Sequence, residues 1–201
     1  MSSPTKERLR AERPIPDDVD LSEDRSDRVE TSSTFLTRAA DLFSRGVLAG
    51  LAAGIPFLLI EMAYFTTIGK PPIAPLLAIS TIFHGTDVPT AVPAQIPVDA
   101  ITGLVLHLGN SMAFGLGFVV LVAALAPLRR ANSLVLLFAG AAYGALLYVV
   151  NIQILGNYVW EAFTAPGASQ LFSFGVHVLF GVLLVPFFLG MNARLRDRAH
   201  S

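Results

Sequence analysis

The 201-residue sequence contains no cysteine and few charged residues. Without cysteine the chain can form no disulfide, no thiolate nucleophile, and no zinc or iron–sulfur centre with cysteine ligands. Charged residues make up only 14% of the chain, whereas 53% of its residues are hydrophobic and the mean hydropathy is +0.61. Ordinary soluble domains have much lower hydropathy, so the composition indicates an integral membrane protein.

The sequence also lacks the short motifs of common enzymes and of nucleic-acid-binding proteins. It contains no phosphate loop, nucleophile elbow, nucleotide fingerprint or nucleic-acid-binding basic stripe. We therefore expect no nucleic-acid partner. Whether the protein is an enzyme stays undecided, although these absences favour a protein without a catalytic centre.

Four long apolar stretches are the main feature that the sequence does contain. They cover about residues 46–65, 101–125, 133–155 and 171–191. Each is long enough to cross a hydrocarbon core of roughly 30 Å, which takes about 20 helical residues. A fifth stretch, Ile73–Phe83, is too short to span, so we expect an interfacial or re-entrant segment within a long first outer loop.

Residues 1–40 differ from the rest of the chain. They mix charges of both signs with Ser, Thr and Pro and show no sustained apolar period, which predicts a disordered tail. The first long apolar run begins near Gly46, too far from the start for a cleaved signal peptide. We expect residues 41–195 to form the four-span transmembrane domain, and the lipid bilayer to be its surrounding partner.

Positive charges are distributed unevenly among the connections between the spans. Arginines occur before the first span, between the second and third spans, and after the fourth: Arg38, Arg45, Arg129, Arg130, Arg194, Arg196 and Arg198. The other two connections contain only Lys70. Because positive residues near spans are retained in the cytoplasm, we predict a multi-pass protein of the plasma (inner) membrane with both termini cytoplasmic.

Small residues recur at helical spacing within the spans. They are Gly46, Gly50 and Gly54 in the first, Ser111 and Gly115 in the second, Gly140 and Gly144 in the third, and Gly181 in the fourth. Such stripes let membrane helices approach closely, and Pro56 and Pro186 should kink the first and last spans. We therefore predict an all-α fold, a four-helix membrane bundle with kinked spans.

One layer of the predicted bundle is polar. Glu61, His107, Asn151 and His177 lie at similar depths, one on each span, and Asn110 lies beside His107. At about 100° per residue, they fall on or near the small-residue faces of their helices. Ionisable groups in the hydrocarbon cost about 2.5–3.5 kcal/mol each and usually mark an ion path or a ligand site. These five residues form the predicted intramembrane polar cluster.

Several functions fit this cluster. Imidazole titrates near neutrality, so a Glu and two His residues could bind or pass protons, and the layer could equally take an ion or a small solute. Alternatively, His107 and His177 could be axial ligands of a haem b, or could bind a metal ion with Glu61, in a redox membrane protein. A third alternative is a structural or assembly protein whose polar layer only registers the helices. We expect no cofactor from the sequence, because it has no local ligand-spacing signature.

The first outer loop adds three further candidates, His84, Asp87 and Asp99, near the expected mouth of the bundle. Solvation of a polar loop is the ordinary explanation for such residues. The unusual length of the loop also permits a lid over the polar layer.

The sequence resembles a loose group of small four-span bacterial inner-membrane proteins of uncharacterised function. The resemblance is carried by three segments, "GLVLHLGNSMAFGLGF", "GAAYGALLYVV" and "FGVHVLFGVLLVPFF". In that group, histidines near the outer ends of spans two and four precede glycines, which here corresponds to His107 with Gly109 and His177 with Gly181. The resemblance implies bacterial origin and the four-span topology, and no established activity. Because four spans enclose little space, we also expect that the protein could be a homo-oligomer.

Overall fold

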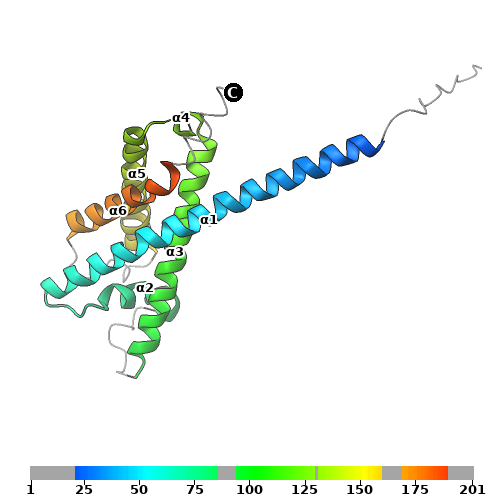
Figure 1. Ribbon diagram of the computed structural model, residues 1–201. Coiled ribbons are helices and arrows are strands. Elements are labelled where there is room, and N and C mark those ends of the chain that lie inside the picture. The colour runs from blue at the N-terminus through cyan, green and yellow to red at the C-terminus, as the bar shows by residue number, and fades with distance from the viewer. Residues whose placement is uncertain (1–20, 86–93, 130, 160–168, 190–201) are drawn as a thin grey trace, which may run out of the picture. The chain divides into compact units, whose positions relative to one another are not determined.

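A computed structural model describes residues 21–85, 94–129, 131–159 and 169–189, and all of the regular elements in these ranges are helical (Figure 1). In chain order they are α1 Leu21–Thr67, α2 Ala74–His84, α3 Ile96–Ala124, α4 Ala126–Arg129, α5 Ser133–Tyr148, the π-helix η2 Val149–Gly156 and α6 Gln170–Leu184. The all-helical prediction is therefore confirmed.

Four helical segments among the described residues are long and apolar enough to cross a membrane. They are Leu36–Thr67, Ile96–Ala124, Ser133–Gly156 and Gln170–Leu189. The lengths of these segments, 32, 29, 24 and 20 residues, are sufficient for a hydrocarbon core of roughly 30 Å. They coincide with the four stretches predicted from hydropathy, as a multi-pass membrane protein requires.

The chain divides into two compact units, Met1–Ala39 and Ala40–Ser201. In the first unit the chain is helical from Leu21, where α1 begins, while residues 1–20 lie outside the described part. The disordered tail therefore stays a prediction. The second unit contains the rest of α1 and all other helices, and it holds the candidate site.

Helices α1 and α3 touch through their small residues. A Cβ added at Gly50 would come closer than 3.0 Å to the Ser111 carbonyl, and one added at Gly115 would overlap the backbone of Gly46 and Gly50. Because real Cβ atoms essentially never approach so closely, only glycine fits these positions. The backbones of α1 and α3 are thus in direct contact, as the small-residue stripes predicted.

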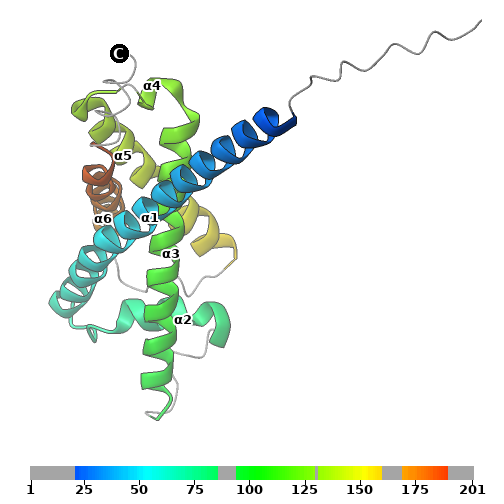
Figure 2. The same cartoon turned by 45° about the vertical axis from the view of Figure 1, so that its right-hand side comes forward.

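Helices α5 and α6 repeat this arrangement. A Cβ at Gly144 would overlap the His177 carbonyl, and one at Gly181 would overlap the backbone of Gly140 and Gly144. Residue for residue, this is the contact pattern of Gly46, Gly50, Ser111 and Gly115 in the first pair. The bundle therefore consists of two similarly packed helix pairs, α1–α3 and α5–α6 (Figures 1 and 2).

The two pairs meet through large side chains. The Tyr64 ring on α1 stacks on Phe172 of α6 with centroids 3.7 Å apart, and the Tyr64 hydroxyl accepts a hydrogen bond from the Ser169 amide. On α5, the Tyr143 hydroxyl donates to the Phe114 carbonyl of α3 at 2.8 Å. Phe114 also meets Phe180 of α6 edge to face. Rings, rather than backbones, set the spacing between the pairs.

Helix α2 packs on α3 at the end of the bundle where α1 ends and α3 begins (Figure 2). A Cβ at Gly103 would overlap the backbone of Leu76, so the α2 and α3 backbones are in contact. The helix has Pro75 in its first turn and ends at His84, and the next residue, Gly85, has a φ of 81° that favours glycine. The predicted short segment is thus a helix; its interfacial or re-entrant placement stays a prediction.

The two prolines inside the predicted spans have different surroundings. Helix α1 continues through Pro56, whereas α6 ends at Leu184 and helical structure resumes at Pro186 after a single turn residue, Val185. A proline is tolerated at the first position of a helix, because the N–H that it lacks would have no partner within the helix there. The predicted kinks at these positions stay predictions.

Candidate functional site

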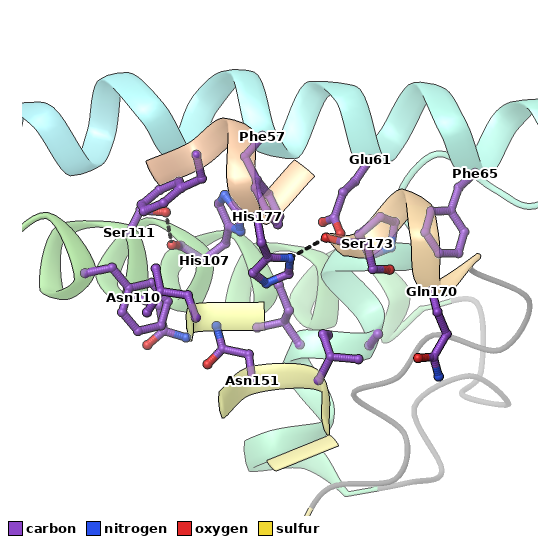
Figure 3. A pocket seen from close by; sticks show the side chains of 17 residues that line it. Phe57, Glu61, Phe65, His107, Asn110, Ser111, Asn151, Gln170, Ser173 and His177 are labelled. Atoms are coloured by element: carbon purple, nitrogen blue, oxygen red, sulfur yellow. Dashed lines mark hydrogen bonds between the residues drawn. The ribbon is translucent and has the colours of Figure 1, made fainter. Parts of the chain in front are cut away.

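A cavity of about 130 Å³ lies between the two helix pairs, and every long helix of the bundle contributes to its wall (Figure 3). Its polar lining residues are Glu61, His107, Asn110, Ser111, Asn151, Gln170, Ser173 and His177. All five members of the predicted polar cluster are therefore on one wall. A volume of this size has room for several waters or for a solute of a few non-hydrogen atoms.

Glu61 is the only acidic side chain on the described wall. It projects from α1 toward the cavity and is partly buried (Figure 3). Among the described residues it has neither a hydrogen-bond donor nor a cationic partner for its carboxyl group. Most buried polar groups are hydrogen-bonded, so an unpartnered carboxyl on a cavity wall points to water or a ligand as its missing partner.

His107 lines the cavity and also takes part in the contact between α1 and α3. Its Nε2 donates a hydrogen bond to the Gly54 carbonyl of α1 at 2.9 Å, and the side chain is buried. A carbonyl can only accept, so this bond places the proton of a neutral ring on Nε2 and leaves Nδ1 as an acceptor. The Ser111 hydroxyl donates back to the His107 carbonyl one turn away.

His177 occupies the equivalent place to Ser111 in the second pair. Its Nδ1 donates to the Ser173 carbonyl one turn earlier, at 2.7 Å. By the same reasoning, a neutral His177 presents Nε2 as an acceptor, and Nε2 has no partner among the described residues. The order His107-x3-Ser111-x3-Gly115 in α3 thus becomes Ser173-x3-His177-x3-Gly181 in α6.

Phe57 lies against both imidazoles. Its ring centroid is 5.7 Å from that of His107 and 5.0 Å from that of His177, and the second contact is edge to face. Phe57 also meets Phe180 of α6 edge to face. Hydropathy reasoning from the sequence did not single out Phe57, because a phenylalanine inside an apolar span gives no distinguishing signal.

The asparagines and the residues near the α2 end complete the polar wall. Asn151 is buried on η2, and its side-chain amide has no hydrogen-bond partner among the described residues. Gln170 accepts from the Tyr148 hydroxyl at 2.9 Å and from Gln153 at 2.8 Å, which leaves its own amide N–H groups available. The sequence prediction missed Gln170 and Ser173; the Ser-x3-His-x3-Gly repeat was the signal for Ser173.

The three loop candidates have separate outcomes. His84, at the end of α2, pairs with Asp99 in the first turn of α3 through Nδ1 and Oδ1 at 2.5 Å, and the Asp99 side chain is buried. Neither residue lines the cavity. Asp87 lies outside the described residues. The His84–Asp99 pair therefore fastens α2 to α3 rather than contributing to the polar wall.

The described residues contain no group of three or more His, Asp or Glu side chains close enough to hold a metal ion. Comparison with known proteins found no matching family model, no matching curated protein and no matching solved structure.

Proposed function

We propose that this protein binds and passes a proton, an ion or a small polar solute at the cavity between its helix pairs. The observation that carries the proposal is the unpartnered Glu61 carboxyl among the described residues, on the wall of a cavity within four membrane-capable helices. An isolated carboxylate costs several kcal/mol to bury in hydrocarbon. If the polar layer were purely structural, we would expect the Glu61 carboxyl, which is the most costly group to bury, to have a hydrogen-bonding or ionic partner.

The surrounding residues support the same function. The N–H groups of His107 and His177 are both engaged by backbone carbonyls, so their remaining ring nitrogens are available to exchange protons or to bind a solute. The buried amide of Asn151 is likewise without a protein partner in the described structure. Three helices besides α1 therefore present polar groups that have hydrogen-bonding capacity left for water or a solute.

The test is flux across reconstituted membranes. Full-length protein in proteoliposomes should dissipate a pH gradient, or a gradient of sodium, potassium, methylammonium or urea, faster than protein-free vesicles do. Glu61→Gln should reduce that flux to the protein-free rate. Thr66→Val is the matched control, because Thr66 lies exposed on the same helix with its hydroxyl bonded to the Met62 carbonyl.

Two results would overturn the proposal. One is flux of all five probes at the protein-free rate. The other is unchanged flux in the Glu61→Gln protein. If this variant also has a larger free energy of unfolding than the wild type, the polar layer serves only to fix how the helices align with one another.

We also infer that the protein lies in a bacterial inner membrane with both termini in the cytoplasm. The inference rests on the arginines that flank the spans at one side and on the single Lys70 at the other. Because the chain lacks cysteine, Lys70→Cys and Ser201→Cys each give one labelling site. A membrane-impermeant maleimide should label Lys70→Cys in intact cells and Ser201→Cys only in opened cells; the reverse pattern would invert the topology.

A further inference from the structure

Three hydrogen-bonding groups of the cavity, on His177, His107 and Glu61, are left as acceptors. His177 uses its Nδ1 proton on Ser173, and His107 uses its Nε2 proton on Gly54. Each neutral ring is therefore left with one acceptor nitrogen. Glu61, when ionised, can only accept. The amides of Asn110 and Asn151 can turn to present either oxygen or nitrogen, whereas the N–H groups of Gln170 stay donors.

The charge of the wall selects a cation. No Lys or Arg is among the described lining residues, and Glu61 is the one side chain among them that becomes negatively charged when it ionises. An anion would meet a carboxylate with no cation to offset it. A neutral solute would leave the carboxylate charge unpaired in hydrocarbon, whereas a cation pairs it.

The type of acceptor narrows the choice among cations. Hard metal ions surround themselves with oxygen ligands, yet two of the three fixed acceptors here are imidazole nitrogens. Transition metals suit imidazole, but among the described residues no three His, Asp or Glu side chains lie close enough to coordinate one metal ion directly. An ammonium group differs from both, since it carries N–H donors that hydrogen-bond equally well to carboxylate and imidazole.

The apolar part of the wall also suits such an ion. Four phenylalanines line the cavity, and Phe57 lies against both imidazoles. Aromatic rings attract cations and pack against methyl groups. The volume of about 130 Å³ limits the occupant to a few non-hydrogen atoms beside any water.

We propose that the cavity binds a small cation that donates hydrogen bonds, ammonium or a short primary alkylammonium, between Glu61 and the acceptor nitrogens of His177 and His107. The proposal rests on the proposed function and names its substrate class. The cationic head pairs with the Glu61 carboxylate, its other N–H groups donate to the imidazoles directly or through a water in the cavity, and a short alkyl group lies against Phe57.

The experiment measures equilibrium binding of radiolabelled methylammonium to the full-length protein. Unlabelled methylammonium and ammonium should displace it at equal ionic strength. Tetramethylammonium, which has the same charge and no N–H donor, and potassium should not. Glu61→Gln should abolish saturable binding. His177→Phe should weaken it about tenfold or more, the usual effect of losing a hydrogen bond to a charged group, and Thr66→Val should leave it unchanged.

The wild-type displacement series decides the proposal even if a variant fails to fold. Absence of saturable methylammonium binding, or displacement by potassium or tetramethylammonium as effective as by ammonium, would overturn it. If protons or potassium nevertheless cross proteoliposomes in a Glu61-dependent way, the proposed function stands and only the substrate class is wrong. If no probe binds and none crosses, both fail.

Discussion

The contacts within the helix pairs differ in kind from the contacts between them. Within α1–α3 and α5–α6, glycines bring backbones together so closely that an added Cβ has no room. Between the pairs, rings such as Tyr64 and Phe172 hold the helices apart. The cavity and its polar wall lie between the pairs. The close backbone contacts should make each pair rigid, and the candidate site lies where the two pairs meet.

The largest expected effect comes from filling the backbone contacts. Gly115→Ala and Gly181→Ala should each lower the free energy of unfolding by about 1–3 kcal/mol, as overpacking of a tight contact does. Both variants place a Cβ against the backbone of the partner helix. Equilibrium unfolding of the purified protein in mixed micelles, followed by circular dichroism, measures the loss.

Gly109→Ala and Gly175→Ala are the matched controls, because a Cβ at either position meets nothing within 4 Å. Both should keep the wild-type stability or gain slightly. Equal losses in all four variants would contradict the assignment of rigidity to the glycine contacts. A loss in only one of Gly115→Ala and Gly181→Ala would show that the two pairs are not equivalent.

A smaller effect should separate the two histidines. The His107 ring bonds across to the Gly54 carbonyl of α1, whereas the His177 ring bonds within its own helix. His107→Phe should therefore lower the unfolding free energy by about 1 kcal/mol, between the average and the maximum measured for hydrogen bonds between membrane helices. His177→Phe should change it much less. The same unfolding measurement applies, and a loss in the His177 variant as large as that in the His107 variant would contradict the distinction.

The sequence was sufficient to predict the helical fold, the four spans and the approach of Glu61, His107, Asn110, Asn151 and His177 to one place. Hydropathy and helical periodicity are local properties, and each span satisfies them independently of its neighbours. The inward position of the polar groups was predictable because each lies on or near the small-residue face of its helix, which packs against another helix.

Other features depend on which helix lies opposite. The ring of Phe57 between two imidazoles, and the backbone carbonyls that take the histidine protons, are contacts between or along helices that no helical wheel specifies. The pairing of His84 with Asp99 depends on how the chain between them folds back. The division of the helices into two pairs could not be predicted without the contacts between them. The sequence does show one trace of it, because the order of His and Ser in α3 is exchanged in α6.

Helix α2 is fastened to α3 by a backbone contact and by a side-chain pair. Its contacts with α3 involve Gly103, Leu76 and the His84–Asp99 pair, none of which lines the cavity, while Pro75, Ala78 and Ile79 on the same helix do. The residues that hold α2 in place are thus separate from those that α2 presents to the cavity. Substitutions at the α2–α3 contact can therefore shift α2, and with it one part of the cavity wall, while the lining side chains stay the same.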